Sequence, residues 1–171
     1  MNKVKPIFTR ILVRMNITLI SVGKTDDRDL QHLLDQYVKR LSHYVSFEWI
    51  IIPDLKNAKR MDEKHQKIKE GEAILKKVQT ADRLILLDEK GKQYTSLAYA
   101  EWMQKKMNSG LKNLVFVIGG PYGFSEAVYR RSDEKLSFST MTFSHQMIRL
   151  FFVEQVYRAY TILKNEPYHH R

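Results

Sequence analysis

Residues 114–123 read Leu114-Val115-Phe116-Val117-Ile118-Gly119-Gly120-Pro121-Tyr122-Gly123, an unbroken apolar run that ends in a glycine-rich loop. An apolar run without polar alternation is typical of a strand buried on both faces, as in a parallel sheet covered by helices. Residues 84–87, Leu84-Ile85-Leu86-Leu87, have the same character. Both segments therefore predict strands of a parallel sheet.

Strand-like and helical patterns alternate along the rest of the chain. Strands are predicted at 16–22, 46–52, 83–87, 114–118 and 136–143. Helices are predicted at 27–43, from a polar loop at 54–64 to about residue 78, at 96–107, directly after Ser125, and from Ser144 to about Asn165. This alternation indicates an α/β domain in which helices flank a parallel-type sheet.

The composition limits the class of protein. A chain of 171 residues corresponds to one domain, and 43% hydrophobic with 28% charged residues is ordinary globular usage. The absence of cysteine excludes disulfides, iron–sulfur clusters and cysteine nucleophiles. A net charge of +10 favours a nucleic acid, an anionic membrane or an acidic protein as partner.

The first residues differ from the rest of the chain. Residues 1–14 hold four basic and no acidic side chains, and Met15 opens the first strand. We predict a basic N-terminal extension at 1–14, disordered or produced by an alternative start, and a single domain at 15–171. A basic arm that contacts RNA is the alternative. Without a secretory signal or a membrane-spanning run, a soluble, cytoplasmic protein is expected.

Three unusual segments follow predicted strands. They are the polar stretch 87–92, the glycine-rich loop 119–123 and the hydroxyl-rich stretch 138–143. Ligands of parallel sheets bind at the carboxyl ends of the strands. Each segment alone has an ordinary explanation, and the glycine-rich loop by itself is typical of a tight turn. Together they favour a nucleotide-like pocket.

The sequence does not support a metal site or a nucleophile for acyl transfer. The six histidines lack metal-ligand spacing, so no metal site is expected. No Gly-x-Ser-x-Gly elbow offers a nucleophile for acyl transfer. Near the C-terminus, His145 and Arg149 are four residues apart, as are Glu154 and Arg158, so each pair lies on one helical stripe. Ion pairing or helix capping explains this spacing about as well as a functional role does.

Two long motifs resemble a known family. Residues 119–123, the run 136–146 from Leu136 to Gln146, and residues 154–159 with the closing 167–169 are similar to RlmH-type ribosomal RNA methyltransferases of the SPOUT superfamily. The resemblance extends from Met15 to the C-terminus. Ser144 stands where many relatives have proline and can serve as a helix N-cap, and the chain ends in His-His-Arg rather than soon after His169.

The resemblance implies an α/β fold with a deep C-terminal trefoil knot, and a homodimer whose pocket abuts the partner subunit. It implies that S-adenosyl-L-methionine donates a methyl group to N3 of a pseudouridine in the decoding-centre stem-loop of 23S ribosomal RNA, on assembled 70S ribosomes. The implied cofactor contacts are Leu87, Gly119, Phe138, Ser139, Thr140, Met141, Thr142 and Phe143.

Methyl transfer from a sulfonium is an in-line displacement, so orientation and removal of the N3 proton are the expected tasks of the protein. Candidate catalytic residues are His145, Tyr168 and His169, and candidate RNA-binding residues are Arg149, Arg158 and Arg171. The C-terminal tail is expected to close over the target base.

Two other functions remain open from the sequence. One is a different SPOUT enzyme that methylates a 2′-hydroxyl or a transfer RNA base. The other is a non-catalytic module that binds RNA or the ribosome, supported by the basic charge alone. Binding of the methyl donor separates the enzymes from the module, whereas salt dependence does not, because phosphate contacts make it steep in every case.

Overall fold

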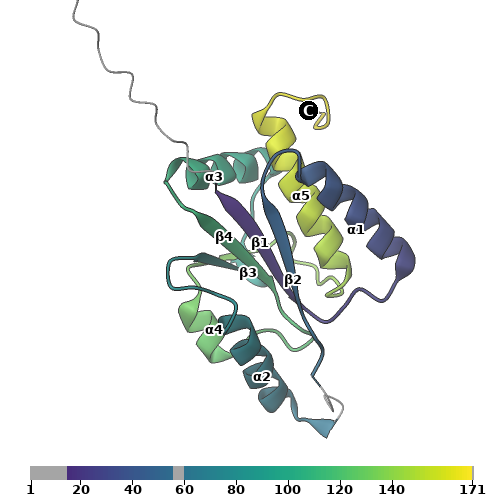
Figure 1. The fold of residues 1–171 in the computed structure, drawn as a ribbon, viewed down its shortest axis with the longest axis vertical. Helices are drawn as coiled ribbons and strands as arrows, with labels where there is room; N and C mark the ends of the chain where they lie inside the picture. Colours follow the sequence, from purple (N-terminus) through teal and green to yellow (C-terminus); the bar gives the residue numbers. More distant parts are fainter. Residues whose placement is uncertain (1–14, 56–59, 171) are drawn as a thin grey trace, which may run out of the picture.

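The computed structural model describes residues 15–55 and 60–170, which form a five-stranded sheet with helices on both faces (Figure 1). The predicted extension at 1–14 and the candidate RNA-binding residue Arg171 lie outside the described residues. The strands are β1 (Asn16–Val22), β2 (Phe47–Ile52), β3 (Arg83–Lys92), β4 (Asn113–Ile118) and β5 (Glu134–Leu136). Their order is β2-β1-β4-β3-β5, and every pair is parallel, so the predicted parallel sheet is confirmed.

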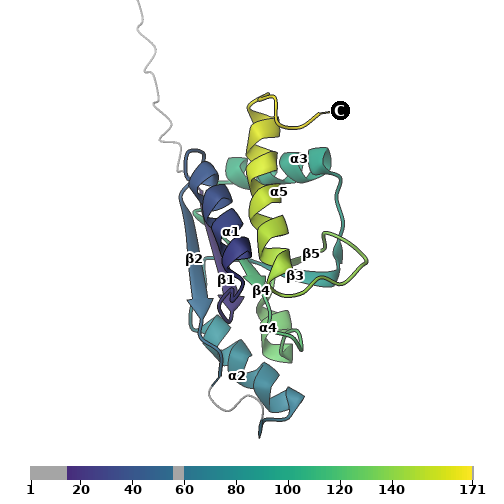
Figure 2. The ribbon, with the colours of Figure 1, turned by 90° about the vertical axis from the view of Figure 1, so that its right-hand side faces the viewer.

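Most of the helices begin at a residue whose side chain caps the first turn. They are α1 (Arg28–Leu41), α2 (Glu63–Leu75), α3 (Ser96–Asn108), α4 (Glu126–Arg131) and α5 (Met147–Leu163). Side chains of Asp27, Asp62, Thr95 and Ser125 accept N–H bonds at the first four starts. Helices α1, α3 and α5 cover one face of the sheet, whereas α2 and α4 cover the other (Figures 1 and 2).

Strand β4 lies in the centre of the sheet and is buried on both faces. Phe116 and its face neighbours pack under α3 and α5, where the Phe116 and Phe152 rings are 4.8 Å apart. Val115 and Val117 pack on the opposite face against residues of α2 and α4. This two-sided burial explains why the strand is continuously apolar.

The structure corrects two predicted strands. Strand β3 continues to Lys92 instead of ending at Leu87, with a bulge in which Leu87 and Lys92 both pair with Leu136. Strand β5 stops at Leu136, so most of the predicted strand 136–143 is irregular. The hydroxyl of Ser137 there donates to the carbonyl of Ser139 at 2.8 Å, a local bond that competes with sheet pairing.

The last helix begins at Met147, three residues after Ser144, and Gln146 rather than Ser144 occupies the N-cap position. The hydroxyl of Ser144 accepts the N–H of Met147, the first residue of α5, at 3.1 Å. Among the described helices, none combines the length and apolar character needed to cross a bilayer.

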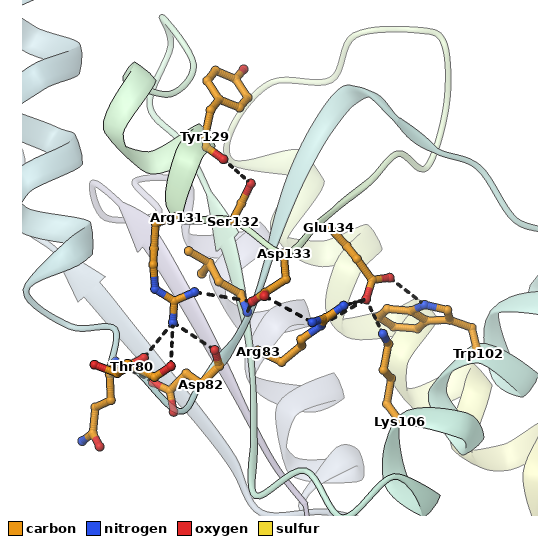
Figure 3. Close-up of polar contacts among 12 residues, drawn as sticks. Thr80, Asp82, Arg83, Trp102, Lys106, Tyr129, Arg131, Ser132, Asp133 and Glu134 are labelled. Carbon is orange, nitrogen blue, oxygen red and sulfur yellow. Dashed lines mark hydrogen bonds and ion pairs between the residues drawn. The ribbon is translucent and has the colours of Figure 1, made fainter.

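A charged network joins the amino ends of β3 and β5 (Figure 3). Glu134 accepts hydrogen bonds from Arg83 at 3.0 Å and Trp102 at 3.1 Å, and also pairs with Lys106. Burial alone would raise the pKa of Glu134, but these three donors outweigh it and hold the pKa below its ordinary value of 4.5. The network therefore secures the short edge strand that leads into the segment 137–146.

We expect Glu134→Gln to lower the free energy of unfolding by about 1–2 kcal/mol at pH 7, because a neutral amide holds two cationic donors less well. Since the folded pKa is depressed, the contribution of Glu134 is full above pH 4.5 and is lost as the pH falls through the lowered pKa. Urea unfolding of the two proteins between pH 7 and 3 measures both the loss of stability at pH 7 and its disappearance at low pH. Glu101→Gln, at an exposed position of α3, is the control. Equal stability of the two variants would contradict the prediction.

Candidate functional site

A cavity of about 580 Å³ opens at the carboxyl ends of β3 and β4 and beside the segment after β5. Its size is typical of small-molecule sites. The three unusual segments of the sequence meet there, as predicted. The lining comprises Leu87–Lys90, Ile118–Phe124, Tyr129, Leu136–Ser139, Met141–His145 and Ile148.

The glycine-rich loop forms one wall of the cavity. Gly123 has φ +79°, a conformation that favours glycine, and its N–H donates to the Gly120 carbonyl at 3.1 Å. A Cβ atom at Gly119 would stand 3.1 Å from the Phe124 ring. The loop is thus the tight turn that the sequence indicates, and it also brings bare backbone to the cavity.

A buried carboxyl group supports this loop from behind. Glu70 of α2 is 3% exposed, and a Cβ atom at Gly120 would lie 2.5 Å from its Oε2. Gln66 donates to Oε1 at 2.8 Å, whereas Oε2 has no partner among the described residues. Burial raises the pKa of Glu70 above its ordinary value. Sequence reasoning missed Glu70, although its spacing of four from Ile74 places both on the buried face of α2.

A second carboxylate is fixed in the part of the wall that β3 contributes. Asp88 accepts the Tyr129 hydroxyl at 2.6 Å and the Lys90 N–H at 2.8 Å. Burial, followed by the hydrogen bond to Asp88, raises the pKa of Tyr129, so its hydroxyl remains a donor. Asp88 and Glu89 bring two carboxylates to the cavity wall beside the single ammonium of Lys90, so this wall keeps a net negative charge that suits a cationic ligand. Tyr129 was not predicted, because only the tertiary fold brings α4 to this strand end.

The segment after β5 forms the remaining wall. The Phe138 ring packs on Tyr99 of α3 and Phe152 of α5, with centroids 6.2 and 6.4 Å away. Of the predicted cofactor residues, all line the cavity except Thr140, which is exposed and lies outside the lining. It sits in a turn where the Ser139 hydroxyl accepts the Met141 N–H at 2.9 Å. Thr140 is therefore removed from the predicted lining.

His145 and Arg149 stand at the start of α5 but differ in their surroundings. His145 lines the cavity, as a candidate catalytic residue should. Arg149 is 0% exposed, which corrects its prediction as a phosphate contact. Its guanidinium donates to the Val22 carbonyl at 2.7 Å, the Thr25 hydroxyl at 2.9 Å and the His145 carbonyl at 3.0 Å. It ties the start of α5 to the end of β1.

We expect Arg149→Lys to lower the free energy of unfolding by about 2–4 kcal/mol, because one ammonium cannot reach three acceptors spread around a planar guanidinium. Burial lowers the pKa of Arg149, and the charges of Asp54 and Asp26 act in the opposite direction. Denaturant unfolding checks the expectation against Arg130→Lys, a change at an exposed position. A loss no larger than that of the control would show that Arg149 does not anchor α5.

The C-terminal candidates do not line the cavity of their own chain. Helix α5 has 17 residues and is about 25 Å long, with His145 before its first turn and Tyr168 and His169 after its last (Figure 2). Arg158 Nε donates to Glu154 at 3.0 Å, and its guanidinium lies over the Tyr168 ring. The structure therefore brings His145 to the cavity but not Arg158, Tyr168 or His169.

Within residues 15–55 and 60–170, no group of acidic, histidine or cysteine side chains is arranged to hold a metal ion.

Comparisons with known proteins identify the family of this chain. Residues 15–169 match the model of a family described as a predicted SPOUT methyltransferase. The chain is 62% identical over 157 residues to "Ribosomal RNA large subunit methyltransferase H" of Christiangramia forsetii, covering 92% of this chain and 100% of that protein. The same-named protein of Flavobacterium johnsoniae is also 62% identical, with the same coverage. That of Parabacteroides distasonis is 58% identical over 91% of this chain and 99% of its own length.

Proposed function

The chain belongs to the SPOUT methyltransferase family, and from this premise we propose that it methylates N3 of a pseudouridine in the decoding-centre stem-loop of 23S ribosomal RNA, on assembled 70S ribosomes. The enzyme is a ribosomal RNA large subunit methyltransferase, as its relatives are by name. The observation that carries the finer proposal is the convergence of Leu87, Gly119 and the segment 138–143 on one cavity.

S-adenosyl-L-methionine is the methyl donor of this family, and the cavity fits it. The donor supplies an electrophilic methyl group on a sulfonium centre. We propose that Leu87, the Gly119 backbone and the segment Phe138–Phe143, apart from Thr140, hold it. The carboxylates of Asp88 and Glu89 outnumber the ammonium of Lys90 in the wall, and the net negative charge favours a ligand that carries a sulfonium and an ammonium. A Cβ atom at Gly119 would crowd the Phe124 ring, so bare backbone is needed there.

The protein must also deal with the N3 proton of the target base. His145 is the candidate general base or orienting group that lies at the cavity. Its position is held from behind by Arg149, which bonds the His145 carbonyl. We propose that His145 accepts the N3 proton, or orients the base through a hydrogen bond with the N3–H, while the cavity walls align N3 with the donated methyl group.

Tyr168 and His169 can take part only if a second subunit brings them to the cavity. Their absence from the lining of their own cavity and an exposed apolar surface both support a homodimer with shared sites. This surface comprises Met141, Phe143, Met147 and Phe151, which are 74%, 38%, 40% and 38% exposed. It adjoins the cavity, so a second copy docked there would border the site.

The remaining features of the proposed enzyme follow from the family. We propose a deep trefoil knot in the C-terminal part, a single methyltransferase domain at 15–171 and a cytoplasmic location. Residues 1–14 are proposed as a basic extension. Arg171 and the exposed basic side chains stay candidates for phosphate contacts.

The test is methyl transfer from labelled S-adenosylmethionine to 70S ribosomes that lack the modification, beside free 23S RNA and separated subunits. Mass spectrometry then maps the methylated nucleotide. Label on a pseudouridine N3 in 70S particles alone is the expected result. Label on a 2′-hydroxyl, on transfer RNA or preferentially on free RNA would overturn the proposed substrate.

A further inference from the structure

The C-terminal tail, residues 165–170, is docked at the far end of α5 from the cavity. Asn165 turns the chain with φ +55°, and the Glu166 N–H then bonds the Thr161 carbonyl at 2.9 Å. The Tyr168 ring packs edge-on against Tyr157, with centroids 4.8 Å apart. The tail therefore leaves the helix along a defined path.

A chain of hydroxyl groups orients Tyr168. Its hydroxyl donates to Glu154 at 2.9 Å and lies 3.1 Å from the hydroxyl of Tyr37 on α1. Because the Tyr168 hydroxyl donates its single hydrogen to Glu154, the Tyr37 hydroxyl must be the donor in the second contact. Arg158 completes the arrangement, since it bonds Glu154 at 3.0 Å and lies 4.7 Å over the Tyr168 ring. We call Tyr37, Glu154, Arg158 and Tyr168 the tail latch.

A second contact from the end of α1 reinforces this docking. The hydroxyl of Tyr44 donates to Glu166, and this bond, followed by burial, raises the pKa of Tyr44 to about 12. The Tyr44 ring also packs on Tyr157 at 5.7 Å. The Tyr44 hydroxyl thus stays protonated, and able to donate, throughout the neutral range.

We propose that Tyr37 is a positioning residue for methyl transfer: through the tail latch it fixes the orientation in which Tyr168 and His169 are presented to the cavity of the partner subunit. The proposal rests on the proposed function, in which the tail acts at that cavity. Tyr37 does not touch the cavity of its own chain, so it acts through Tyr168. Its ring also packs on Tyr157 at 6.0 Å and under Arg40, contacts that the hydroxyl does not make.

Tyr37→Phe removes the hydroxyl and keeps both ring contacts. At saturating 70S ribosomes, we expect kcat to fall about fivefold, the factor that one ordinary hydrogen bond represents. The KM for S-adenosylmethionine should stay within about twofold, because Tyr37 does not line the cavity. Hydrogen–deuterium exchange in a peptide covering 164–170 should accelerate, whereas exchange in 136–146 should not change.

Tyr99→Phe is the matched control, because it removes a buried tyrosine hydroxyl that has no partner among the described residues. It should change neither kcat nor tail exchange. A double substitution gives a further check: Tyr37→Phe should have little effect in a Tyr168→Phe background, because both remove the same contact.

Four results would overturn the proposal. Unchanged tail exchange in Tyr37→Phe would show that the tail latch does not hold the tail. Faster exchange with full kcat, or an effect on the KM for the donor as large as that on kcat, would show that Tyr37 does not position Tyr168 for transfer. An unaltered enzyme that leaves 70S pseudouridine unmethylated would overturn the proposed function, and this inference with it. If the unaltered enzyme methylates 70S pseudouridine but Tyr37→Phe gives one of the first three results, the inference about Tyr37 is wrong and the proposed function stands.

Discussion

A protein with valine in place of Gly119 is expected to bind S-adenosyl-L-methionine at least about 100-fold more weakly than the unaltered enzyme. A Cβ atom at this position would already lie 3.1 Å from the Phe124 ring, and valine adds two methyl groups beside a wall of the cavity. Since cores and pocket walls are close-packed, the loop must move or the donor must be excluded. Isothermal titration calorimetry with the donor measures the loss.

The control is Gly110→Ala. Gly110 also occupies a turn, with φ +80°, but a Cβ atom there meets nothing within 4 Å, and the residue lies outside the cavity. Alanine costs about 1 kcal/mol of stability at a positive φ, which separates a general loss of folding from a loss of binding. Donor binding by Gly119→Val at the unaltered affinity would mean that the donor site lies elsewhere.

Truncation after Pro167 is expected to reduce methyl transfer to 70S ribosomes at least about 100-fold, the size of effect typical for loss of a group that acts on the proton in transfer. Donor affinity should change by less than about twofold, because Tyr168 and His169 lie beyond the last turn of α5 and outside their own cavity. Steady-state kinetics together with calorimetry separate the two quantities. Full activity of the truncated protein would remove the tail from the proposed mechanism.

Mixed dimers distinguish a shared site from a merely damaged subunit. A Gly119→Val subunit retains the tail, and a truncated subunit retains the cavity. Half of randomly assorted dimers are mixed and hold one intact shared site, so co-expression should recover about a quarter of the unaltered activity. If neither variant restores the other, Tyr168 and His169 do not serve the partner's cavity. Size-exclusion chromatography of each variant checks that dimers persist.

The location of the cavity was predictable from the sequence, because it follows from chain order. Buried strands at 84–87 and 114–118 indicate a parallel sheet, and parallel strands end at the same edge. Leu87 and Gly119 had to meet there once both strands joined one sheet. The segment 138–143 was placed correctly beside them although it is irregular, because β5 supplies only the three residues Glu134–Leu136 before the chain turns.

Side-chain environments were less predictable. Arg149 has the spacing from His145 of an exposed helical pair, yet the packing of α5 against α1 and β1 buries it on three acceptors. Thr140 belongs to a hydroxyl-rich run, but a local turn leaves it outside the cavity. Glu70 and Tyr129 reach the cavity region from helices that no motif connects with it. Short-range patterns do not report which helix face meets which strand end.

The sequence by itself determined the parallel α/β fold, the cavity at the strand ends and the resemblance to methyltransferases. These features depend on continuous apolar runs, on the order of strands and helices, and on the order of motifs, all of which are visible in the sequence. Only the tertiary structure decided that His145 stands at the cavity while Tyr168 is held outside the cavity, against α5, by Tyr37 and Glu154. The physical reason is that the contacts of Tyr168 with Glu154, Tyr157 and Tyr37 fix its side chain against α5 and α1, outside the cavity lining. His145 therefore lines the cavity of its own chain, whereas Tyr168 and His169 do not.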